Sequence, residues 1–282
     1  MSTLARKKTG RIAYYREVCQ KGSSENYLFD KYVFRHFSIF PTILFIKLGV
    51  QPNTATFLSL MATVGSCFFL ISNDPLWMMV GVALIFTYYT LDHVDGELAR
   101  YYIRTGQREP ALSGQYFDVL VHSYSSNIML FFLGVSVYHQ FGYWWAIYVG
   151  FIGCLGASTF PNLVAARVLM QKVVISPDVL DRPEAAGALR RIERKEQQVE
   201  AMQASLLDDA KLKKIIAEAI GFPGLLILIM LAVTADAILG TFEVSGFELN
   251  GRLLLIGVMA FLHTVKTFAF LRSWMRLMRP IR

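Results

Sequence analysis

Charged residues are scarce in this sequence. Only 17% of its 282 residues are Asp, Glu, Lys or Arg, whereas 54% are hydrophobic. A soluble domain usually carries about 25% charged residues. The composition therefore argues against a soluble globular protein and indicates a chain for which lipid is part of the solvent.

Cysteine is scarce as well, which limits the metal and disulfide chemistry open to the chain. The three cysteines, Cys19, Cys67 and Cys154, show no paired spacing. A zinc site or a disulfide framework needs such pairs, and we expect neither.

Internal repeats and nucleic-acid recognition motifs are also lacking. The net charge of +7 therefore indicates contact with anionic lipid headgroups and not with nucleic acid.

Long apolar runs are what the sequence does contain. They lie at residues 53–72, 76–91, 117–138, 143–166, 222–240 and 253–271. Most approach the roughly 20 residues that cross a bilayer. The second run is short and can cross only if its helix continues through the charged stretch that follows it. We expect an all-α integral membrane protein with six transmembrane helices.

The other segments are expected to flank these helices. Residues 1–40 are basic and aromatic, which is typical of an amphipathic segment in the membrane interface. Residues 41–171 would form the first four transmembrane helices, with the catalytic motif among them. Residues 172–218 are predicted to form a cytosolic helical insertion that packs on the membrane domain or pairs with a second subunit. Residues 219–282 would supply the last two spans and a basic cytosolic tail.

The distribution of basic residues predicts the topology. The chain does not open with an apolar segment followed by a small-residue cleavage site, so we expect its N-terminus in the cytosol. Six spans threaded from there put all but two of the 28 Lys and Arg residues on the cytosolic side. The two are Arg252, outside, and Lys266, within the last span. The positive-inside rule then places both termini in the cytosol.

The stretch "LDHVDGELARYY" follows the second apolar run. Positions three, four and seven apart share one face of a helix. Two carboxylates and two small residues of this stretch therefore lie on one side, with an arginine beside them. These residues are Asp92, Asp95, Gly96, Ala99 and Arg100.

A second helix is predicted to begin near "SGQYFDVLVHS", where Gly114, Asp118 and His122 recur at intervals of four. Two antiparallel helices joined by a cytosolic loop would bring the two faces together. Three carboxylates and an imidazole at a membrane boundary need compensating charge, which hard divalent cations such as Mg²⁺ or Mn²⁺ supply. The small residues would let a phosphate approach the backbone, although they also let membrane helices touch.

The order of these positions resembles the signature of the CDP-alcohol phosphotransferase (CDP-alcohol phosphatidyltransferase) family. Asp-x-x-Asp-Gly-x-x-Ala-Arg begins at Asp92, and Gly-x-x-x-Asp-x-x-x-His begins at Gly114. The stretch "QPNTATF" at the start of the first span is similar to the Pro-Asn-x-x-Thr element of that family, with Asn53 as its Asn.

The resemblance implies a membrane-embedded enzyme of phospholipid or surface-glycolipid biosynthesis. Such an enzyme transfers a substituted phosphoryl group from a CDP-activated alcohol to an acceptor hydroxyl, releases CMP, and has its active site on the cytosolic side. A homodimer and the bacterial inner membrane are also implied. Two divalent cations, Mg²⁺ or Mn²⁺, would be held by Asp92, Asp95, Asp118 and His122. The cytidine nucleotide would be bound by Asn53, Asp95, Gly96, Ala99, Arg100 and Gly114.

His122 departs from the family pattern, because it stands where the family has a fourth Asp, the general base. Imidazole is a competent base near neutral pH and a metal ligand, so we expect activity, with a second metal that is weaker or absent. The alternative is a catalytically altered relative in which His122 only fills space.

The loop "YYIRTGQREPALS" is the second departure, because it is longer than the family's usual spacing. Its first four residues are predicted to extend the preceding helix. Arg104 or Arg108 would then contact an anionic substrate. Arg167 and Lys266 are further candidates for the acceptor or an anion, although both can instead snorkel to the headgroups.

Two other classes of function stay open. In a transporter the acids would bind a permeating cation, and acids would occur at similar depth on several helices. Here they gather on two helices at one membrane edge, which favours an enzyme. In a noncatalytic scaffold, residues 172–218 would recruit a partner and Asp92 and His122 would be dispensable.

Overall fold

The computed structural model describes residues 10–20, 30–108, 112–158 and 222–277, and these are almost entirely helical. The elements in chain order are α2 (Arg11–Cys19), the π-helix η2 (Asp30–Phe34), α3 (Arg35–Leu48), α4 (Pro52–Leu70), α5 (Pro75–Arg104), α6 (Leu112–Phe141), α7 (Trp145–Ser158), α12 (Phe222–Leu239), β1 (Phe242–Val244), β2 (Phe247–Leu249) and α13 (Gly251–Leu277). The insertion expected at 172–218 and Arg167 lie outside the described residues.

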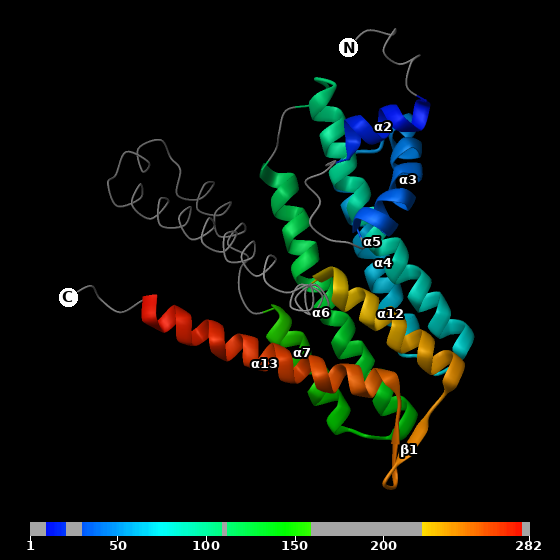
Figure 1. Ribbon diagram of the computed structural model, residues 1–282, viewed down its shortest axis with the longest axis vertical. Helices are drawn as coiled ribbons and strands as arrows, with labels where there is room; N and C mark the ends of the chain where they lie inside the picture. The colour runs from blue at the N-terminus through cyan, green and yellow to red at the C-terminus, as the bar shows by residue number, and fades with distance from the viewer. Residues whose placement is uncertain (1–9, 21–29, 109–111, 159–221, 278–282) are drawn as a thin grey trace, which may run out of the picture. The chain divides into compact units, whose positions relative to one another are not determined.

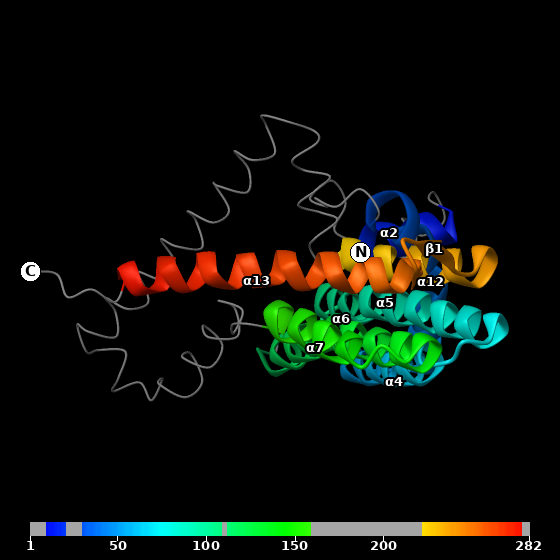
Figure 2. The same ribbon diagram turned by 90° about the horizontal axis from the view of Figure 1, so that it is seen from below.

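The chain divides into two compact units, and the division falls within α6. The first unit ends at Val121 and the second begins at His122. In the first, α4 packs along α5, and α2, η2 and α3 also lie against α5 (Figure 1). In the second, α13 runs along α7 and also packs on α12 (Figure 2).

α5 carries the apolar run and the charged stretch in one uninterrupted helix. Asp74 caps its start by accepting hydrogen bonds from the backbone N–H groups of Leu76 and Trp77, at 2.8 and 3.4 Å, and Pro75 occupies the first turn. The helix ends at Arg104, and Gly106 follows it in the left-handed region with φ of 70°. The predicted continuation through the charged stretch, including the extension beyond Arg100, is confirmed.

α4 has the polarity that a helix facing lipid requires. Its exposed stripe is apolar, whereas its buried face carries small hydroxyl residues. The exposed residues are Phe57, Met61, Val64 and Phe68, and the buried ones are Thr56, Ser59, Thr63 and Ser66. The hydroxyls of Ser59 and Ser66 donate to carbonyl oxygens of their own helix, so these two buried hydroxyls are satisfied.

Two of the described helices, α4 and α5, are long and apolar enough to cross a membrane. Four shorter apolar stretches of 10–17 residues lie in α6, α7, α12 and α13. Each of the six predicted runs therefore overlaps one of the described helices, while the count of six spans stays a prediction.

A buried glutamate ties the N-terminal segment to α5. Glu97 is fully buried, and its carboxylate accepts hydrogen bonds from Ser38 (2.8 Å) and Thr42 (2.6 Å) on α3 and from the Gln20 amide (3.1 Å). The Arg35 guanidinium lies 3.5 Å from the same carboxylate and supplies the opposite charge. A charge without such partners would be costly in this position.

The opposite face of α3 is apolar and exposed. It carries Phe37, Phe40, Leu44 and Leu48 at helical spacing. A helix with one buried polar face and one exposed apolar face is suited to the membrane interface. α3 runs through residue 40, so the boundary expected there falls inside a helix.

In the second unit, two glycines let α6 and α7 approach closely. A Cβ on Gly134 would lie 2.5 Å from the backbone oxygen of Ala146, and a Cβ on Gly150 would lie 2.6 Å from that of Leu130. Contacts this short are excluded, so only glycine permits the crossing. The sequence did not distinguish these two glycines from the others in apolar runs.

Arg252, one of the two basic residues that the predicted topology does not place on the cytosolic side, is buried in an ion pair. Its Nε lies 2.8 Å from Asp236 Oδ2, and its Nη1 donates to Ser136. Asp236 also accepts from the backbone N–H groups of Gly251 (2.6 Å) and Arg252 (3.0 Å), which caps the start of α13.

Between α12 and α13 the chain forms a β-hairpin. β1 and β2 pair antiparallel with Val244 opposite Phe247, and the turn residues Ser245 and Gly246 have φ of 53° and 84°. Two positive φ angles define a type I′ turn, which matches the twist of paired strands. The Ser-Gly pair between "FEV" and "FEL" was the available signal for this hairpin.

Gly150→Ala is predicted to destabilise the protein by about 2 kcal/mol, because its Cβ would overlap the α6 backbone. Gly257→Ala on α13 is the matched control. It has open space around its Cβ position and should be stabilising by about 1 kcal/mol, because alanine favours the helix. Thermal unfolding of the purified proteins in detergent measures both. Equal effects of the two changes would contradict the close crossing.

Glu97→Gln is predicted to destabilise the protein by about 3 kcal/mol, because it removes the charge that compensates buried Arg35. Glu243→Gln on the exposed strand β1 is the control and should change stability by less than about 0.5 kcal/mol. Thermal unfolding again provides the measurement. A Glu97→Gln protein as stable as its control would mean that the carboxylate does not anchor the N-terminal segment.

Candidate active site

Three of the four predicted metal ligands meet in the structure. Asp92 lies on α5 and Asp118 on α6, and His122 follows Asp118 by one turn of the same helix. One ligand atom of each lies within 4.8 Å of the other two. On α6, Asp118 and His122 are four residues apart and so lie on one face of the helix, close to Asp92 of α5.

The geometry and chemistry of this group fit a hard divalent cation. Mg²⁺ binds its ligands at about 2.1 Å in an octahedron, so ligand atoms on one ion lie about 3 to 4.2 Å apart. Separations within 4.8 Å need only small side-chain adjustments to reach this range. Two carboxylates and an imidazole are donors that Mg²⁺ and Mn²⁺ accept. All three side chains are half-buried, so they are open to a ligand.

Asp95 is oriented by a neighbouring helix. It is buried, and its Oδ2 accepts a hydrogen bond of 2.6 Å from the Thr56 hydroxyl on α4. Asp95 does not belong to the group formed by Asp92, Asp118 and His122. Thr56 is the Thr of the Pro-Asn-x-x-Thr element, and sequence reasoning did not assign it a role. Its position three residues after Asn53 was the available signal.

Asn53 and Gly114, both predicted on the nucleotide side, lie against each other. The Asn53 Oδ1 is 3.3 Å from the place where a Cβ on Gly114 would lie. Any side chain at position 114 would therefore have to displace Asn53. The glycine permits this approach between the first turns of α4 and α6.

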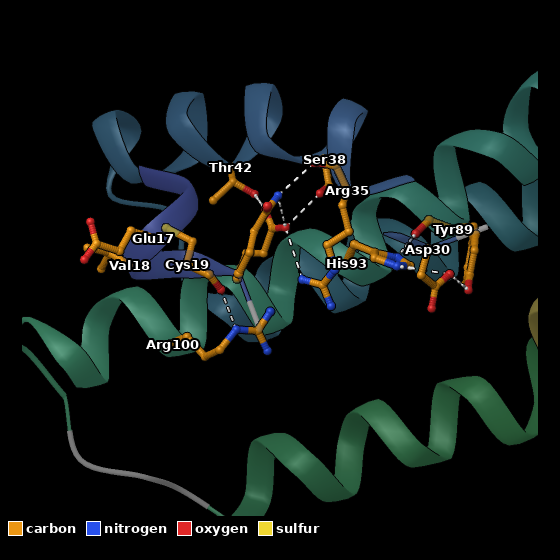
Figure 3. Close-up of polar contacts among 12 residues, drawn as sticks. Glu17, Val18, Cys19, Asp30, Arg35, Ser38, Thr42, Tyr89, His93 and Arg100 are labelled. Atoms are coloured by element: carbon orange, nitrogen blue, oxygen red, sulfur yellow. Dashed lines mark hydrogen bonds and ion pairs between the residues drawn. The ribbon is translucent and has the colours of Figure 1, made fainter. Parts of the chain in front are cut away.

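Arg100 and Arg104 bind the end of α2, and Figure 3 shows Arg100 with its partner Cys19. Arg100 Nε donates to the carbonyl oxygen of Cys19, and Arg104 donates to those of Glu17 (3.0 Å) and Val18 (2.7 Å). The last carbonyl groups of a helix have no partner within it, and a cation there also interacts favourably with the helix dipole. Arg104, predicted to contact an anion, thus has a structural role that its sequence position did not indicate.

The Arg100 guanidinium also lies along Gly96. A Cβ on Gly96 would be 3.2 Å from Arg100 Nη1. Gly96 therefore leaves the space that the guanidinium occupies. Cys19, whose carbonyl oxygen accepts a hydrogen bond from Arg100, is buried. This burial raises the pKa of its thiol to about 12, so the thiol is protonated at neutral pH.

The other predicted residues contribute less to this picture. Ala99 lies on α5 and is half-buried, and Arg108 is exposed beyond the end of α5. Lys266 lies on α13, and its side chain is outside the described part of the structure. Arg167 lies outside it entirely.

His93, the residue after Asp92, belongs to a buried polar cluster with Asp30 and Tyr89 (Figure 3). His93 Nδ1 lies 3.0 Å from the carbonyl oxygen of Tyr89 and must donate to it, while His93 Nε2 lies 3.4 Å from Asp30 Oδ1. The Tyr89 hydroxyl donates to the same Asp30 oxygen, and Phe34 packs against both rings. Asp30 had no signal in the sequence, because its partners lie about sixty residues away.

The environment of Asp30 lowers its pKa. Burial acts to raise the pKa, but hydrogen bonds from His93 and Tyr89 and the nearby charges of His93 and Arg35 outweigh it. A carboxyl group with a lowered pKa in the folded state stabilises the fold at neutral pH. This contribution is lost as the pH falls through the lowered pKa.

The family model of CDP-alcohol phosphatidyltransferases matches residues 50–190, which is half of the chain. The chain belongs to this family. The match contains Asp92, Asp118 and His122 together with the Pro-Asn-x-x-Thr element, so the predicted family is confirmed. No curated protein matches the chain. CDP-alcohol phosphatidyltransferases are membrane-bound transferases that use divalent metals, and Asp92, Asp118 and His122 can hold such an ion.

Thr56→Val is predicted to destabilise the protein by about 1–3 kcal/mol, because the change keeps the shape but removes a hydrogen bond to a buried carboxylate. Thr63→Val is the control, since the Thr63 hydroxyl bonds only to a carbonyl of its own helix. It should cost less than about 1 kcal/mol. Thermal unfolding distinguishes the two, and a larger effect at Thr63 would contradict the role of Thr56.

Proposed function

We propose that this chain is a membrane-embedded CDP-alcohol phosphotransferase of phospholipid or surface-glycolipid biosynthesis. It transfers a substituted phosphoryl group from a CDP-alcohol donor to the hydroxyl of a lipid or headgroup acceptor and releases CMP. The observation that carries the proposal is the group of Asp92, Asp118 and His122 in a chain of this family.

The acids bind the diphosphate of the donor through two divalent cations, Mg²⁺ or Mn²⁺. Asp92, Asp95 and Asp118 would hold these cations, and His122 would complete the set only while it is not acting as a base, because a neutral imidazole has a single nitrogen lone pair. When bound, the cations neutralise charge on the diphosphate and so favour the departure of CMP. Thr56 orients the Asp95 carboxylate through its hydrogen bond to Oδ2.

His122 acts as the general base. The acceptor hydroxyl gives its proton to the imidazole while its oxygen forms a bond to phosphorus. The bond between phosphorus and the CMP oxygen breaks, and CMP leaves. An imidazole has a suitable pKa for this step near neutral pH, and the adjacent carboxylate of Asp118 stabilises the charge that it gains.

The nucleotide lies beside the small residues of the motif. Gly96, Ala99 and Gly114 permit a close approach of the cytidine diphosphate, with Asn53 and Arg100 as polar contacts. Arg108 is exposed beyond the end of α5, and we assign it to an anionic acceptor. Arg104, Arg167 and Lys266 are weaker candidates for binding an anionic acceptor.

The chain has both termini in the cytosol and its site at the cytosolic edge of a bacterial inner membrane. Support comes from two basic residues at the charged end of α5, Arg100 and Arg104, and from the exposed apolar face of α3. It functions as a homodimer.

His122→Ala is predicted to lower the rate of CMP release by about 10²–10⁴-fold, the usual effect of losing a general base. His139→Ala is the matched control, because His139 is exposed near the other end of α6. The assay uses purified protein with Mg²⁺ or Mn²⁺, CDP-diacylglycerol or CDP-ethanolamine as donor, and a membrane lipid extract as acceptor. Release should disappear when the metal is chelated.

Asp95→Asn is a second test of the proposal. A variant that remains folded should lose the phosphoryl transfer reaction. Absence of CMP release and of cytidine nucleotide binding across the donor panel would contradict the proposal and favour a catalytically altered relative. Cation flux in vesicles without CMP release would favour a transporter.

A further inference from the structure

Ser125 has a buried hydroxyl that the fold does not use. The residue is 1% exposed, and among the described side chains none forms a hydrogen bond with its Oγ. Several other buried hydroxyls of the described helices have partners. Ser59 and Ser66 donate to their own helix, and Ser136 accepts from Arg252. An unpaired buried hydroxyl is unfavourable, so we look for its partner in a bound substrate.

The hydroxyl lies on the face of α6 that carries the proposed chemistry. Ser125 follows His122 by three residues and Asp118 by seven, so all three project to one side of the helix. His122 is half-buried, so a ligand that reaches its imidazole also comes within reach of the next turn.

The spacing between the two side chains suits one bound oxygen atom. Residues three apart on a helix have Cβ atoms about 5–6 Å apart. Two hydrogen bonds of about 2.8 Å to one shared oxygen allow their two end atoms to lie up to about 5.6 Å apart, which side chains on neighbouring turns can satisfy. A single hydroxyl oxygen between His122 and Ser125 can therefore bond to both.

We propose that Ser125 contacts the acceptor and orients its attacking hydroxyl. The acceptor hydroxyl donates its hydrogen to His122, while its oxygen accepts a hydrogen bond from the Ser125 Oγ. This arrangement leaves one lone pair of the oxygen directed at phosphorus, and Ser125 keeps its own proton throughout. The inference rests on the proposed function, because it requires an acceptor hydroxyl at His122.

Ser125→Ala tests the inference through substrate dependence and stability together. The KM for the acceptor should rise about tenfold, as expected for the loss of one hydrogen bond, while the KM for the CDP-alcohol should stay unchanged. The unfolding temperature should stay unchanged or rise, because an unpaired buried hydroxyl is removed. The probes are the membrane lipid extract, varied at fixed donor, and the CDP-alcohol that supports CMP release.

Two further variants complete the test. Ser125→Thr keeps the hydroxyl and should restore most of the acceptor affinity. Ser66→Ala on α4 is the matched control, and its acceptor KM should equal that of the unsubstituted protein, because its hydroxyl bonds within its own helix.

The outcomes separate the two proposals. A Ser125→Ala protein with a lowered unfolding temperature and an unchanged acceptor KM would overturn the role of Ser125 alone and make it a packing residue. Equal increases in both KM values would also overturn it, because they would indicate a general distortion of the site. No CMP release from the unsubstituted protein with any donor would overturn the proposed function and this inference with it.

Discussion

The buried carboxylate of Glu97 is the interaction on which the first unit depends. It accepts hydrogen bonds from Ser38, Thr42 and Gln20 and pairs with Arg35, so it holds α3 and the end of α2 against α5. A charge in this position is tolerated only with all of these partners. The partners are polar residues of the N-terminal segment, which therefore turns its apolar residues outward. One buried charge thus accounts for both faces of α3.

Helix geometry explains how α5 serves this scaffold and the site together. Successive residues are about 100° apart around a helix, so the charged stretch divides into two stripes about 120° from each other. His93, Glu97, Arg100 and Arg104 form one stripe. Its partners in the N-terminal segment include Asp30 in η2, Arg35 in α3 and Cys19 in α2. Asp92, Asp95, Gly96 and Ala99 form the other. The charged residues of "DHVDGELARYYIR" therefore belong to two faces of one helix, one that anchors the N-terminal segment and one that carries the proposed site.

Much of this could be predicted from the sequence, and the limits have a physical reason. Apolar runs predicted the helices, and spacing of three and four brought Asp92, Asp118 and His122 together, because both signals are local and periodic. The partners of Glu97 and Asp30 lie 55 to 77 residues away along the chain, where no periodicity connects them. Gly134 and Gly150 were equally silent, because a glycine required by a helix crossing looks like any other in an apolar run.

The two stripes also change how the motif is interpreted. Arg100 belongs to the family signature on the nucleotide side, yet its Nε donates to the carbonyl oxygen of Cys19 on α2. Its guanidinium occupies the space that Gly96 leaves open, between the stripe that anchors α2 and the stripe that carries the acids. Arg100 contacts the N-terminal helix, and in the proposed function it also contacts the nucleotide. The end of α2 is therefore a part of the proposed nucleotide site, because it holds the arginine that the nucleotide would meet.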